Sequence, residues 1–476
     1  MNGRVRLKTS VFLLLCGVAC SPATAVRSQL LVVIDTDAHL AGELASRPDV
    51  SPDAAVDSLR IDVLDTANVA YDTNLFLVPE IANWPVSFGV VAAGTGATVR
   101  LRVRAFRARF AEPGTEFGKA TLDPPVEVTL DRLVFIPIPA SGMATVRVLL
   151  SMDCLGIASS FTAPETTCVD TGRPAVAPDE GVESASDTSL PPTRAGTWPY
   201  AVERPCHSSP ADGTACIPGG FGVLGDYSAV GFAEVPQMEP IPLHAVVVLP
   251  FLLDRDEVTV GRARQLVLSG ALPKTALEWS SDLVLAAYCT WLGTDVESND
   301  PLPLNCVAAS TARQICALVG GTLPSEAQWE YTARGRGQGR RYPWGDDDPT
   351  CCALSMSRAP GSSDPVCPGS GPEPVGSHLP SASCAGLGDV TRDGVRDMAG
   401  SVGEIVLDSW EPYSAPCWGR GVLLDPVCQV EGAASEMRGG DWTSSFVGAL
   451  LVERLLSGVG VSAGFRCAYQ DLDPSP

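Results

Sequence analysis

Cysteine is the residue that most constrains the fold of this chain. There are 16 cysteines in 476 residues. The first two lie in an N-terminal segment typical of an export signal, in which Arg4, Arg6 and Lys8 precede the apolar run VFLLLCGVAC. In exported proteins, cysteines form disulfides more readily than metal sites. We therefore expect a fold held by covalent cross-links.

Fourteen cysteines follow the leader residues Cys16 and Cys20, which is an even number. The adjacent Cys351 and Cys352 cannot point the same way, so we expect them to have different partners. The full connectivity cannot be read from the sequence. Three close pairs would form short loops, each contributing roughly 3 kcal/mol in the loop-entropy model: Cys154 with Cys168, Cys206 with Cys216, and Cys417 with Cys428.

The leader suggests two routes of processing. The run GVAC is similar to a bacterial lipobox, in which Cys20 would become the lipidated first residue, whereas ATA at 23–25 fits ordinary cleavage. We favour lipidation, because Cys20 otherwise has no evident role except as the polar end of the apolar run. The expected location is the bacterial cell envelope, as an outer-membrane lipoprotein attached to the membrane by its lipid, with a periplasmic or secreted protein as the alternative. No later apolar run is long enough for a membrane helix.

Composition narrows the class of protein. The 46 glycines and 40 prolines predict many turns and short elements. With 33 basic and 55 acidic residues the net charge is -22, which makes nucleic acid an improbable partner. A zinc site is also not expected, because the histidines show no ligand spacing; they are His39, His207, His244 and His378.

Length and composition predict two domains. Seven short β-type runs between residues 29 and 154 are typical of an all-β, sandwich-like domain. A stretch rich in Pro, Ser, Asp and Glu follows and reads as a linker. The expected segments are a signal peptide at 1–19, an anchor or tether at 20–28, the sandwich-like domain at 29–170, a disordered linker at 171–204, a second domain at 205–470 and a tail at 471–476.

One predicted strand carries an arginine stripe. Val99, Leu101 and Val103 alternate with Arg100, Arg102 and Arg104, and the apolar set then slips by one, which predicts a β-bulge near Ala105. The stripe could bind an anionic sugar or surface. We favour a solvated outer face on which long side chains shield the sheet.

The second domain contains motifs that occur in a fixed order. In this order the chain resembles the sulfatase-modifying factor, or formylglycine-generating enzyme, family over roughly residues 214–470. The resemblance implies a compact, loop-rich α+β domain related to C-type lectin folds. The motifs are IPGGF, LLDRDEVTV, PLNCVAASTARQICALVGGTLPSEAQWEYTARG, YPWGDDDP, PVGS, DGVRDMAGSVGEIVLDSW, RGGDW and GFRCA.

Several helices can be predicted within this region from local signals. Ser325 and Gln328 form a capping-box pattern for a helix that Gly335 would end. The runs LVLAAYCTWLG and ARQICALVGG have similar helical spacing, and their Cys289 and Cys316 are expected in disulfides or in the core.

The resemblance implies copper chemistry that this chain does not support. Catalytic members use two cysteines after RGG to hold copper and to oxidise a substrate cysteine. Ser444 and Ala449 occupy those positions here, and neither can replace a thiolate as a soft-metal ligand. Cys467 lies outside the expected pair and is interpreted as a disulfide partner. We therefore expect no catalytic residue and no copper.

A structural calcium site is also only partly kept. Glu404 remains, but Ser401 stands where the family has an asparagine ligand. The acidic run 346–348 could form a second site or a solvated turn. Five residues are expected to build the groove and its scaffold, with Trp442 expected in the core: Arg438, Gly439, Gly440, Trp442 and Arg466.

These observations favour an exported, lipid-anchored protein whose second domain is non-catalytic and binds a small molecule or a protein partner. One alternative is a formylglycine-generating oxidase with a displaced metal site. Another is a purely structural envelope protein. Fold alone does not decide between them.

Overall fold

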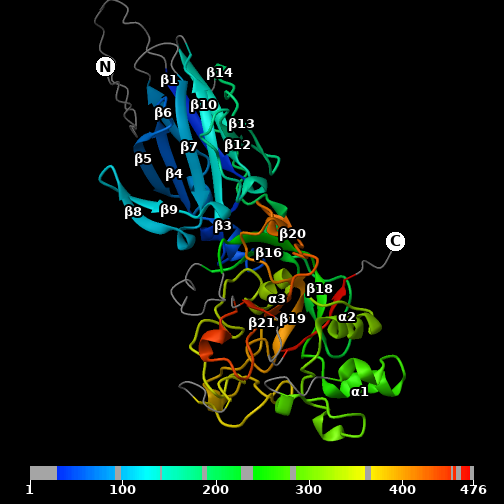
Figure 1. Cartoon of the computed structure of the whole chain (residues 1–476). Coiled ribbons are helices and arrows are strands. Elements are labelled where there is room, and N and C mark those ends of the chain that lie inside the picture. The colour runs from blue at the N-terminus through cyan, green and yellow to red at the C-terminus, as the bar shows by residue number, and fades with distance from the viewer. Residues whose placement is uncertain are drawn as a thin grey trace, which may run out of the picture. The chain divides into compact units, whose positions relative to one another are not determined.

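The computed structural model describes residues 29–91, 98–139, 142–184, 190–226, 240–278, 286–359, 366–451, 454–456 and 463–471. The described chain is mostly β, with few helices, and forms two compact units (Figure 1). Unit 1 comprises residues up to 201 together with 420–422, and unit 2 comprises the rest. The leader and Cys20 lie outside the described residues. No described helix is both long enough and apolar enough to cross a membrane.

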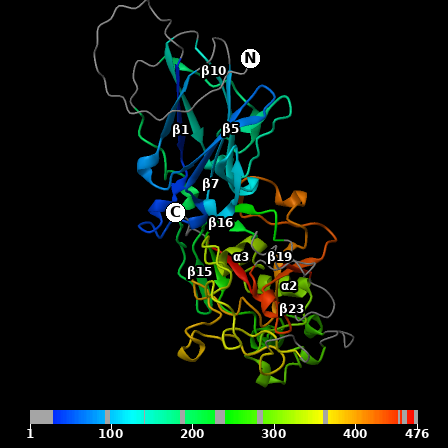
Figure 2. The ribbon, with the colours of Figure 1, turned by 90° about the vertical axis from the view of Figure 1, so that its left-hand side faces the viewer.

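Unit 1 contains two four-stranded sheets, and its long strands run together lengthwise (Figure 2). All seven β-type runs of the sequence are strands of these sheets. The first sheet is mixed, because its central strand β1 pairs in parallel with β11 and antiparallel with β6. The strand order of the first sheet is β14 (Glu183–Ser184), β11 (Met143–Leu150), β1 (Gln29–Thr36) and β6 (Val86–Val91). The strand order of the second sheet is β10 (Thr129–Pro137), β7 (Thr98–Phe106), β4 (Ser58–Leu64) and β5 (Ala70–Leu77).

Three two-stranded pairs account for the other strands in the described part of unit 1. They are β2 (His39–Leu40) with β3 (Ala55–Val56), β8 (Glu112–Glu116) with β9 (Lys119–Asp123), and β12 (Thr166–Cys168) with β13 (Pro174–Val176).

The expected bulge in β7 is wrong. The strand keeps a continuous register with both β10 and β4 up to Phe106, and the chain then forms a 3₁₀ turn at Ala108–Phe110. The apolar residues after Phe106 therefore belong to a turn and do not continue the strand.

The arginine stripe of β7 is not a solvated face, which corrects the favoured interpretation. Arg102 donates to both carboxylate oxygens of Asp131 at 2.8 and 2.7 Å, and Arg104 donates to Asp62 at 2.8 Å. Arg100 donates to Glu165 at 2.9 Å. The stripe is thus partly or wholly buried under carboxylate partners.

The described part of the segment expected as a disordered linker, 171–204, is ordered. It contributes β13 and β14, and Thr193 donates from its hydroxyl to Asp35 at 2.6 Å. Trp198 is buried and its indole donates to Asp153 at 2.9 Å. The few aromatic residues in this polar stretch therefore anchor it to unit 1.

The described residues of unit 2 form three small sheets. Short strands joined by long loops are the expected result of its glycine and proline content. In order, the sheets are β15 (Thr214–Ile217), β18 (Phe251–Asp254), β24 (Ala468–Gln470); then β16 (Gly220–Leu224), β17 (His244–Val248), β20 (Leu423–Leu424); then β22 (Arg454–Leu456), β21 (Ser435–Arg438), β19 (Gly403–Ser409), β23 (Ala463–Gly464).

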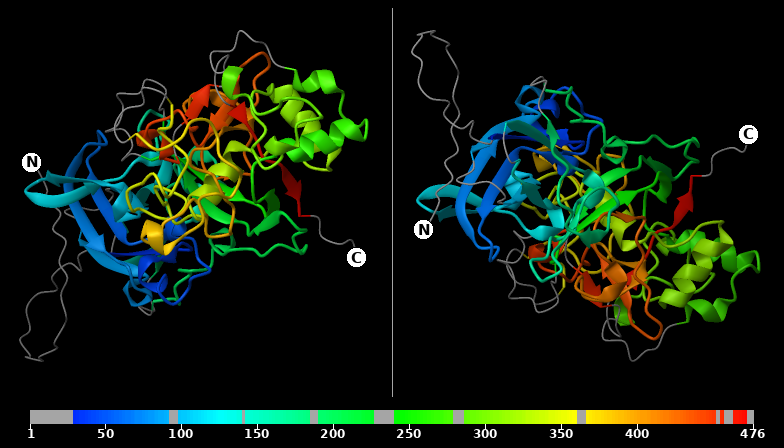
Figure 3. Two further views of the ribbon diagram at one scale, coloured as in Figure 1. Left: turned by 90° about the horizontal axis from the view of Figure 1, so that it is seen from below. Right: turned by 90° about the horizontal axis from the view of Figure 1, so that it is seen from above.

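The described residues of unit 2 include three α-helices: α1 (Val260–Leu268), α2 (Ala309–Leu318) and α3 (Glu326–Ala333). Helices α1 and α2 lie side by side and share one apolar cluster (Figure 3). Helix α3 begins with the expected capping box of Ser325 and Gln328. It is buried almost completely, including Glu326 and Glu330, which later form ion pairs. The run LVLAAYCTWLG differs from the prediction, because its described part forms only a 3₁₀ turn at Ala286–Tyr288.

Seven disulfides pair all fourteen cysteines of the described residues. The three short-loop pairs of the sequence are joined, and Cys351 and Cys352 bond to Cys367 and Cys384, respectively. The two remaining pairs are Cys289 with Cys306 and Cys316 with Cys467.

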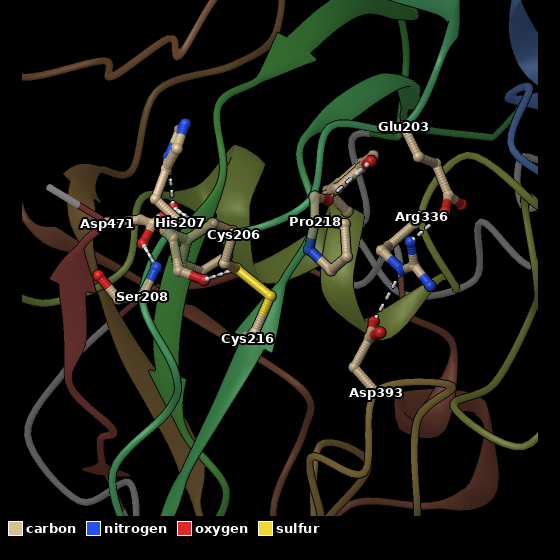
Figure 4. Close-up of a disulfide and its surroundings, with 11 residues drawn as sticks. Glu203, Cys206, His207, Ser208, Cys216, Pro218, Arg336, Asp393 and Asp471 are labelled. Atoms are coloured by element: carbon tan, nitrogen blue, oxygen red, sulfur yellow. Dashed lines mark hydrogen bonds and ion pairs between the residues drawn. A yellow bond between two sulfur atoms is a disulfide. The ribbon is translucent and has the colours of Figure 1, made fainter. Parts of the chain in front are cut away.

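The start of unit 2 is tied to its end. Asp471 accepts hydrogen bonds from the backbone amides of His207 at 2.6 Å and Ser208 at 2.8 Å, next to the Cys206–Cys216 disulfide (Figure 4). Nearby, Arg336 pairs with Glu203 at 2.6 Å and with Asp393 at 3.0 Å. The entry of the chain into the unit is therefore fixed by both covalent and ionic contacts.

Candidate functional site

The candidate site is the loop that follows two consecutive glycines, residues 441–451. Gly439 and Gly440 both have positive φ, 89° and 65°. A Cβ on Gly440 would lie 2.7 Å from the carbonyl oxygen of Gly448, and one on Gly439 would lie 2.8 Å from that of Met398. Only glycine allows the loop to fold back this closely on its own start.

Asp441 organises the first half of the loop. Its Oδ1 accepts from the amide of Thr443 at 2.8 Å, from the Thr443 hydroxyl at 2.6 Å and from the amide of Ser444 at 3.1 Å. The backbone carbonyl of Ser444 accepts from the amide of Ser357 at 2.9 Å. Ser444 is half-buried and fixed on both sides, so hydrogen bonds within the chain define the conformation of this part of the loop.

Ala449, which the family resemblance aligns with the second copper cysteine, is fully buried. It lies in an apolar cluster with Leu354, Met356 and Leu450, against which Trp344 and Phe446 pack. A methyl group in a packed apolar cluster offers no ligand atom. The side chain at this position is therefore part of the core.

No thiolate is available elsewhere in the described chain. Every cysteine of the described residues is in a disulfide, and Cys467, which follows the last family motif, is bonded to Cys316. Copper(I) selects soft sulfur ligands. The residues at this loop therefore do not fit the copper ion that the family resemblance implies.

Aromatic side chains surround the loop. Trp442 is fully buried, as expected for a core residue, and its ring lies 4.5 Å from that of Tyr288. Tyr342 and Trp344 stack at 5.1 Å, and Trp344 and Phe446 remain half-buried. These two side chains can offer apolar area to a ligand. The sequence analysis did not single out Trp344 or Phe446, although the YPWG motif contains the former.

Arg438, expected in the groove or its scaffold, lies in the interior beside helix α3. It is fully buried and donates to Glu326 at 2.9 Å, to Glu330 at 2.5 Å and to the carbonyl of Leu451 at 2.6 Å. Burial alone would raise the pKa of Glu326, but Arg454 and Arg438 together hold it below its usual value. The strand before the two glycines is thus joined to helix α3 and to the end of the loop.

Arg466 has a similar structural position. It donates to both oxygens of Glu404, at 2.7 Å from Nε and 2.5 Å from Nη2, and all these atoms are buried. Trp329 donates its indole hydrogen to the same carboxylate at 2.9 Å. Glu404 thus serves as the counter-ion of Arg466.

The calcium ligands expected at Glu404 and Ser401 do not fit a cation in this arrangement. Both Glu404 oxygens already accept hydrogen bonds from Arg466 and Trp329. Across the described residues, no group of three His, Cys, Asp or Glu side chains is arranged to hold a metal. The acidic run 346–348 is exposed, and Asp346 and Asp347 accept hydrogen bonds within the turn, from the amide of Arg341 and the indole of Trp344.

Three buried carboxyl groups were missed by sequence reasoning. Burial raises the pKa of Glu257, Asp389 and Asp397, to about 6 for Asp397, and the Asp397 charge adds to the effect on the other two. Both oxygens of Glu257 lack a hydrogen-bond partner in the described structure. Their sequence motifs, DRDEVTV and DVTRDGVRD, resemble ordinary acidic loops, so burial could not be read from them.

Comparisons with known proteins match this unit. The family model described as sulfatase-modifying factor enzyme 1-like domain matches residues 201–470. A formylglycine-generating enzyme of Streptomyces coelicolor is 26% identical over 294 residues, which is 54% of this chain and 88% of that protein. A hercynine oxygenase of Mycolicibacterium thermoresistibile is 28% identical over 271 residues, covering 48% of this chain and 55% of that protein.

Two further matches are more limited. The inactive C-alpha-formylglycine-generating enzyme 2 of Bos taurus is 39% identical over 54 residues, 11% of this chain and 18% of that protein. The solved structure of PvdO from Pseudomonas aeruginosa matches with a TM-score of 0.41 and 22% identity, over 54% of this chain and 93% of that one.

Proposed function

Because the chain belongs to the sulfatase-modifying factor enzyme 1-like family through residues 201–470, we propose that unit 2 is a non-catalytic member that binds a small molecule or a protein partner at the loop 441–451. Because its relatives include enzymes, a specific chemical reason is needed to infer that this chain is not catalytic. That reason lies in the sulfur chemistry of the chain.

The observation that carries the proposal is the state of the thiols. Ser444 and Ala449 stand at the copper cysteine positions, and the cysteines of the described residues are paired in disulfides. A hydroxyl and a methyl group cannot bind copper(I) as thiolates do. The loop is nevertheless well ordered by Asp441 and by the buried Arg438, so its shape is kept.

A retained shape without metal ligands favours binding. Half-buried Trp344 and Phe446 pack against the same apolar cluster as Ala449, and Ser445, next to Phe446 in the chain, is exposed. Aromatic side chains that are partly accessible contribute much of the binding energy at protein interfaces. A ligand with an apolar group flanked by hydrogen-bonding groups would match this composition.

The decisive experiment offers the full chain a peptide of the form Cys-x-Pro-x-Arg, with Cu(I) and oxygen, and follows the cysteine by mass spectrometry. The Streptomyces coelicolor enzyme serves as the positive control. We expect no conversion by this chain. Appearance of formylglycine would overturn the proposal and direct attention to Cys351, Cys352 and Cys467 as sources of a displaced copper site.

The fold type of each unit and the location of the protein are a second set of proposals. We propose that unit 1 is sandwich-like, that unit 2 has a C-type-lectin-like fold, and that Cys20 is lipidated and retains the protein in the cell envelope. The two four-stranded sheets of unit 1 support the first statement, and the GVAC motif supports the third. Replacing Cys20 by Ser should release the protein from the membrane fraction, and retention of the variant there would contradict lipidation.

A calcium titration tests the remaining cofactor expectation. Because Glu404 is engaged by Arg466 and Trp329, calcium should leave the melting temperature of unit 2 unchanged. An increase that Glu404→Gln abolishes would show that the carboxylate can exchange Arg466 for a cation.

A further inference from the structure

One face of the second sheet of unit 1 carries more positive than negative charge. The period-two alternation of strands places four arginines on it, Arg60, Arg100, Arg102 and Arg104, with only two carboxylates of the same sheet, Asp62 and Asp131. Arg60 and Arg104 are direct partners in the register of β4 and β7. Like charges opposite each other on neighbouring strands are destabilising, so this pair needs an external anion.

The hairpin β8–β9 supplies that anion. Glu116 pairs with Arg60, and Asp123 lies 3.1 Å from Arg104 and 3.7 Å from Arg60. Asp62 lies between the two guanidinium groups, 3.0 Å from Arg60 and 2.8 Å from Arg104. The two hairpin carboxylates therefore pair with guanidinium groups that have too few carboxylate partners within the sheet.

The hairpin is attached by charge and has little apolar contact. All five residues of β8 are exposed, and Thr121 alone is buried in β9. Phe117 at the turn is 56% exposed. The further contacts of the hairpin are polar: Lys119 donates to Asp72 at 2.7 Å and to the carbonyl of Thr73 at 2.9 Å on the edge strand β5, and Arg60 donates to the carbonyl of Leu122 at 3.3 Å. A two-stranded hairpin held in this way is marginally stable on the body of the unit.

The hairpin β8–β9 leaves one hydrogen-bond donor of the arginines beneath it without a partner. Arg104 is 6% exposed, and its Nε is buried without a hydrogen-bond partner in the described structure. Leaving a charged donor unpaired is costly. A ligand that offers more anionic oxygens than the hairpin would therefore bind this face more completely.

We propose that the hairpin Glu112–Asp123 is a displaceable cover over a binding site for a polyanionic polysaccharide, with Glu116 and Asp123 standing in for the carboxylate or sulfate groups of that ligand. The arginines are recessed, with Arg60 and Arg104 only 4% and 6% exposed. A thin linear chain can reach them once the hairpin lifts, whereas a bilayer surface cannot. The site is independent of the function proposed for unit 2.

Limited digestion with a lysine-specific protease measures the opening. Among the described residues the only lysines are Lys119, in the hairpin, and Lys274, which belongs to unit 2 and is an internal reference. Replacing both hairpin carboxylates, Glu116→Gln with Asp123→Asn, should accelerate cleavage at Lys119 severalfold relative to Lys274. Raising the salt concentration should do the same for the natural chain. The matched control is Glu112→Gln with Glu127→Gln, which removes the same charge from residues without an ion pair in the described structure. Equal cleavage in all forms would refute a displaceable cover.

Binding to immobilised dextran sulfate and alginate, with neutral dextran as reference, tests the ligand. The full chain carrying Glu116→Gln and Asp123→Asn should bind both polyanions several times more tightly than the natural chain. Adding Arg104→Gln, or Arg100→Gln should Arg104→Gln not fold, should remove the gain. Arg147→Gln, an exposed arginine of the other sheet, should leave it unchanged. Preference for anionic vesicles or DNA, or no gain for the opened variant, would overturn the assignment.

Discussion

Arg454 and Glu326 form a two-pronged ion pair in the interior of unit 2. Nε of Arg454 lies 2.6 Å from Oε1 of Glu326 and Nη2 lies 3.0 Å from Oε2, and neither side chain is exposed. The pair joins the strand after the candidate loop to helix α3, where Arg438 reaches the same carboxylate. The loop is therefore positioned from both of its ends by one glutamate.

Removing one partner of this pair should be severely destabilising. Arg454→Met leaves Glu326 with an unbalanced buried charge, and the expected loss is about 3–5 kcal/mol of unfolding free energy. Urea denaturation followed by tryptophan fluorescence measures it. Arg313→Met is the control, because that arginine is exposed and should change stability by less than about 0.5 kcal/mol. Similar losses in the two variants would argue against the pair as the anchor of the loop.

Ser444 and Ala449 should respond differently to replacement by cysteine. Ala449→Cys adds a sulfur to a fully packed cluster and should cost about 1–3 kcal/mol. Ser444→Cys replaces a half-buried hydroxyl and should be nearly neutral. Thermal melting of both variants under non-reducing conditions, with a count of free thiols, makes the comparison. Equal melting temperatures would mean that space for a second thiol has been retained.

The disulfides should differ in their contribution to stability. The Cys316–Cys467 bridge spans 151 residues, so its removal by a double Ala substitution should cost about 5 kcal/mol in the loop-entropy model. The Cys206–Cys216 bridge spans 10 residues and should contribute about 3 kcal/mol. Denaturant midpoints of the two double variants test the order. A reversed order would show that the His207–Asp471 contacts amplify the effect of the shorter bridge.

Asp408 should make the stability of unit 2 depend on pH. Burial, assisted by the charge of Glu326, raises the pKa of Asp408 from 3.8 to about 7. The folded state therefore binds this proton more tightly than the unfolded state, and stability from Asp408 falls as pH rises from about 4 to about 7. Above pH 7 the contribution is constant.

Replacing Asp408 by Asn removes this titration. The natural chain should gain stability relative to the variant as pH falls from 7 to 4, and the difference should be level above pH 7. Denaturation at several pH values measures the difference, and exposed Asp346→Asn is the matched control. A difference that stays constant from pH 4 to pH 8 would contradict the raised pKa.

Local signals in the sequence were sufficient for several elements. The capping box of Ser325 and Gln328 marks the start of helix α3 because cap and helix are neighbours in the chain. The short disulfide loops follow from spacing for the same reason. The run LVLAAYCTWLG has helical spacing but only a 3₁₀ turn in its described part, and the Cys289–Cys306 bridge holds the chain in an irregular path there.

Long-range partners could not be predicted. Nothing near Cys316 indicates Cys467, and nothing near Arg438 indicates Glu326 and Glu330, which lie more than 100 positions away. The arginine stripe was visible, yet whether it meets solvent depends on the carboxylates of a hairpin and of Glu165. Ser444 and Ala449 could be singled out from their spacing after the two glycines, whereas the burial of Ala449 depends on the fold.

The contact of Asp471 with His207 and Ser208 bears on whether the two ends of unit 2 can be joined or grafted into another protein. Because Asp471 accepts hydrogen bonds from the backbone amides of these two residues, the entry and the exit of the described part of the unit lie close together. A short peptide joining them would make the backbone circular without changing any strand pairing, and new ends could be opened at the exposed turn 346–348. Neighbouring ends of this kind are what insertion into a surface loop of a host protein requires.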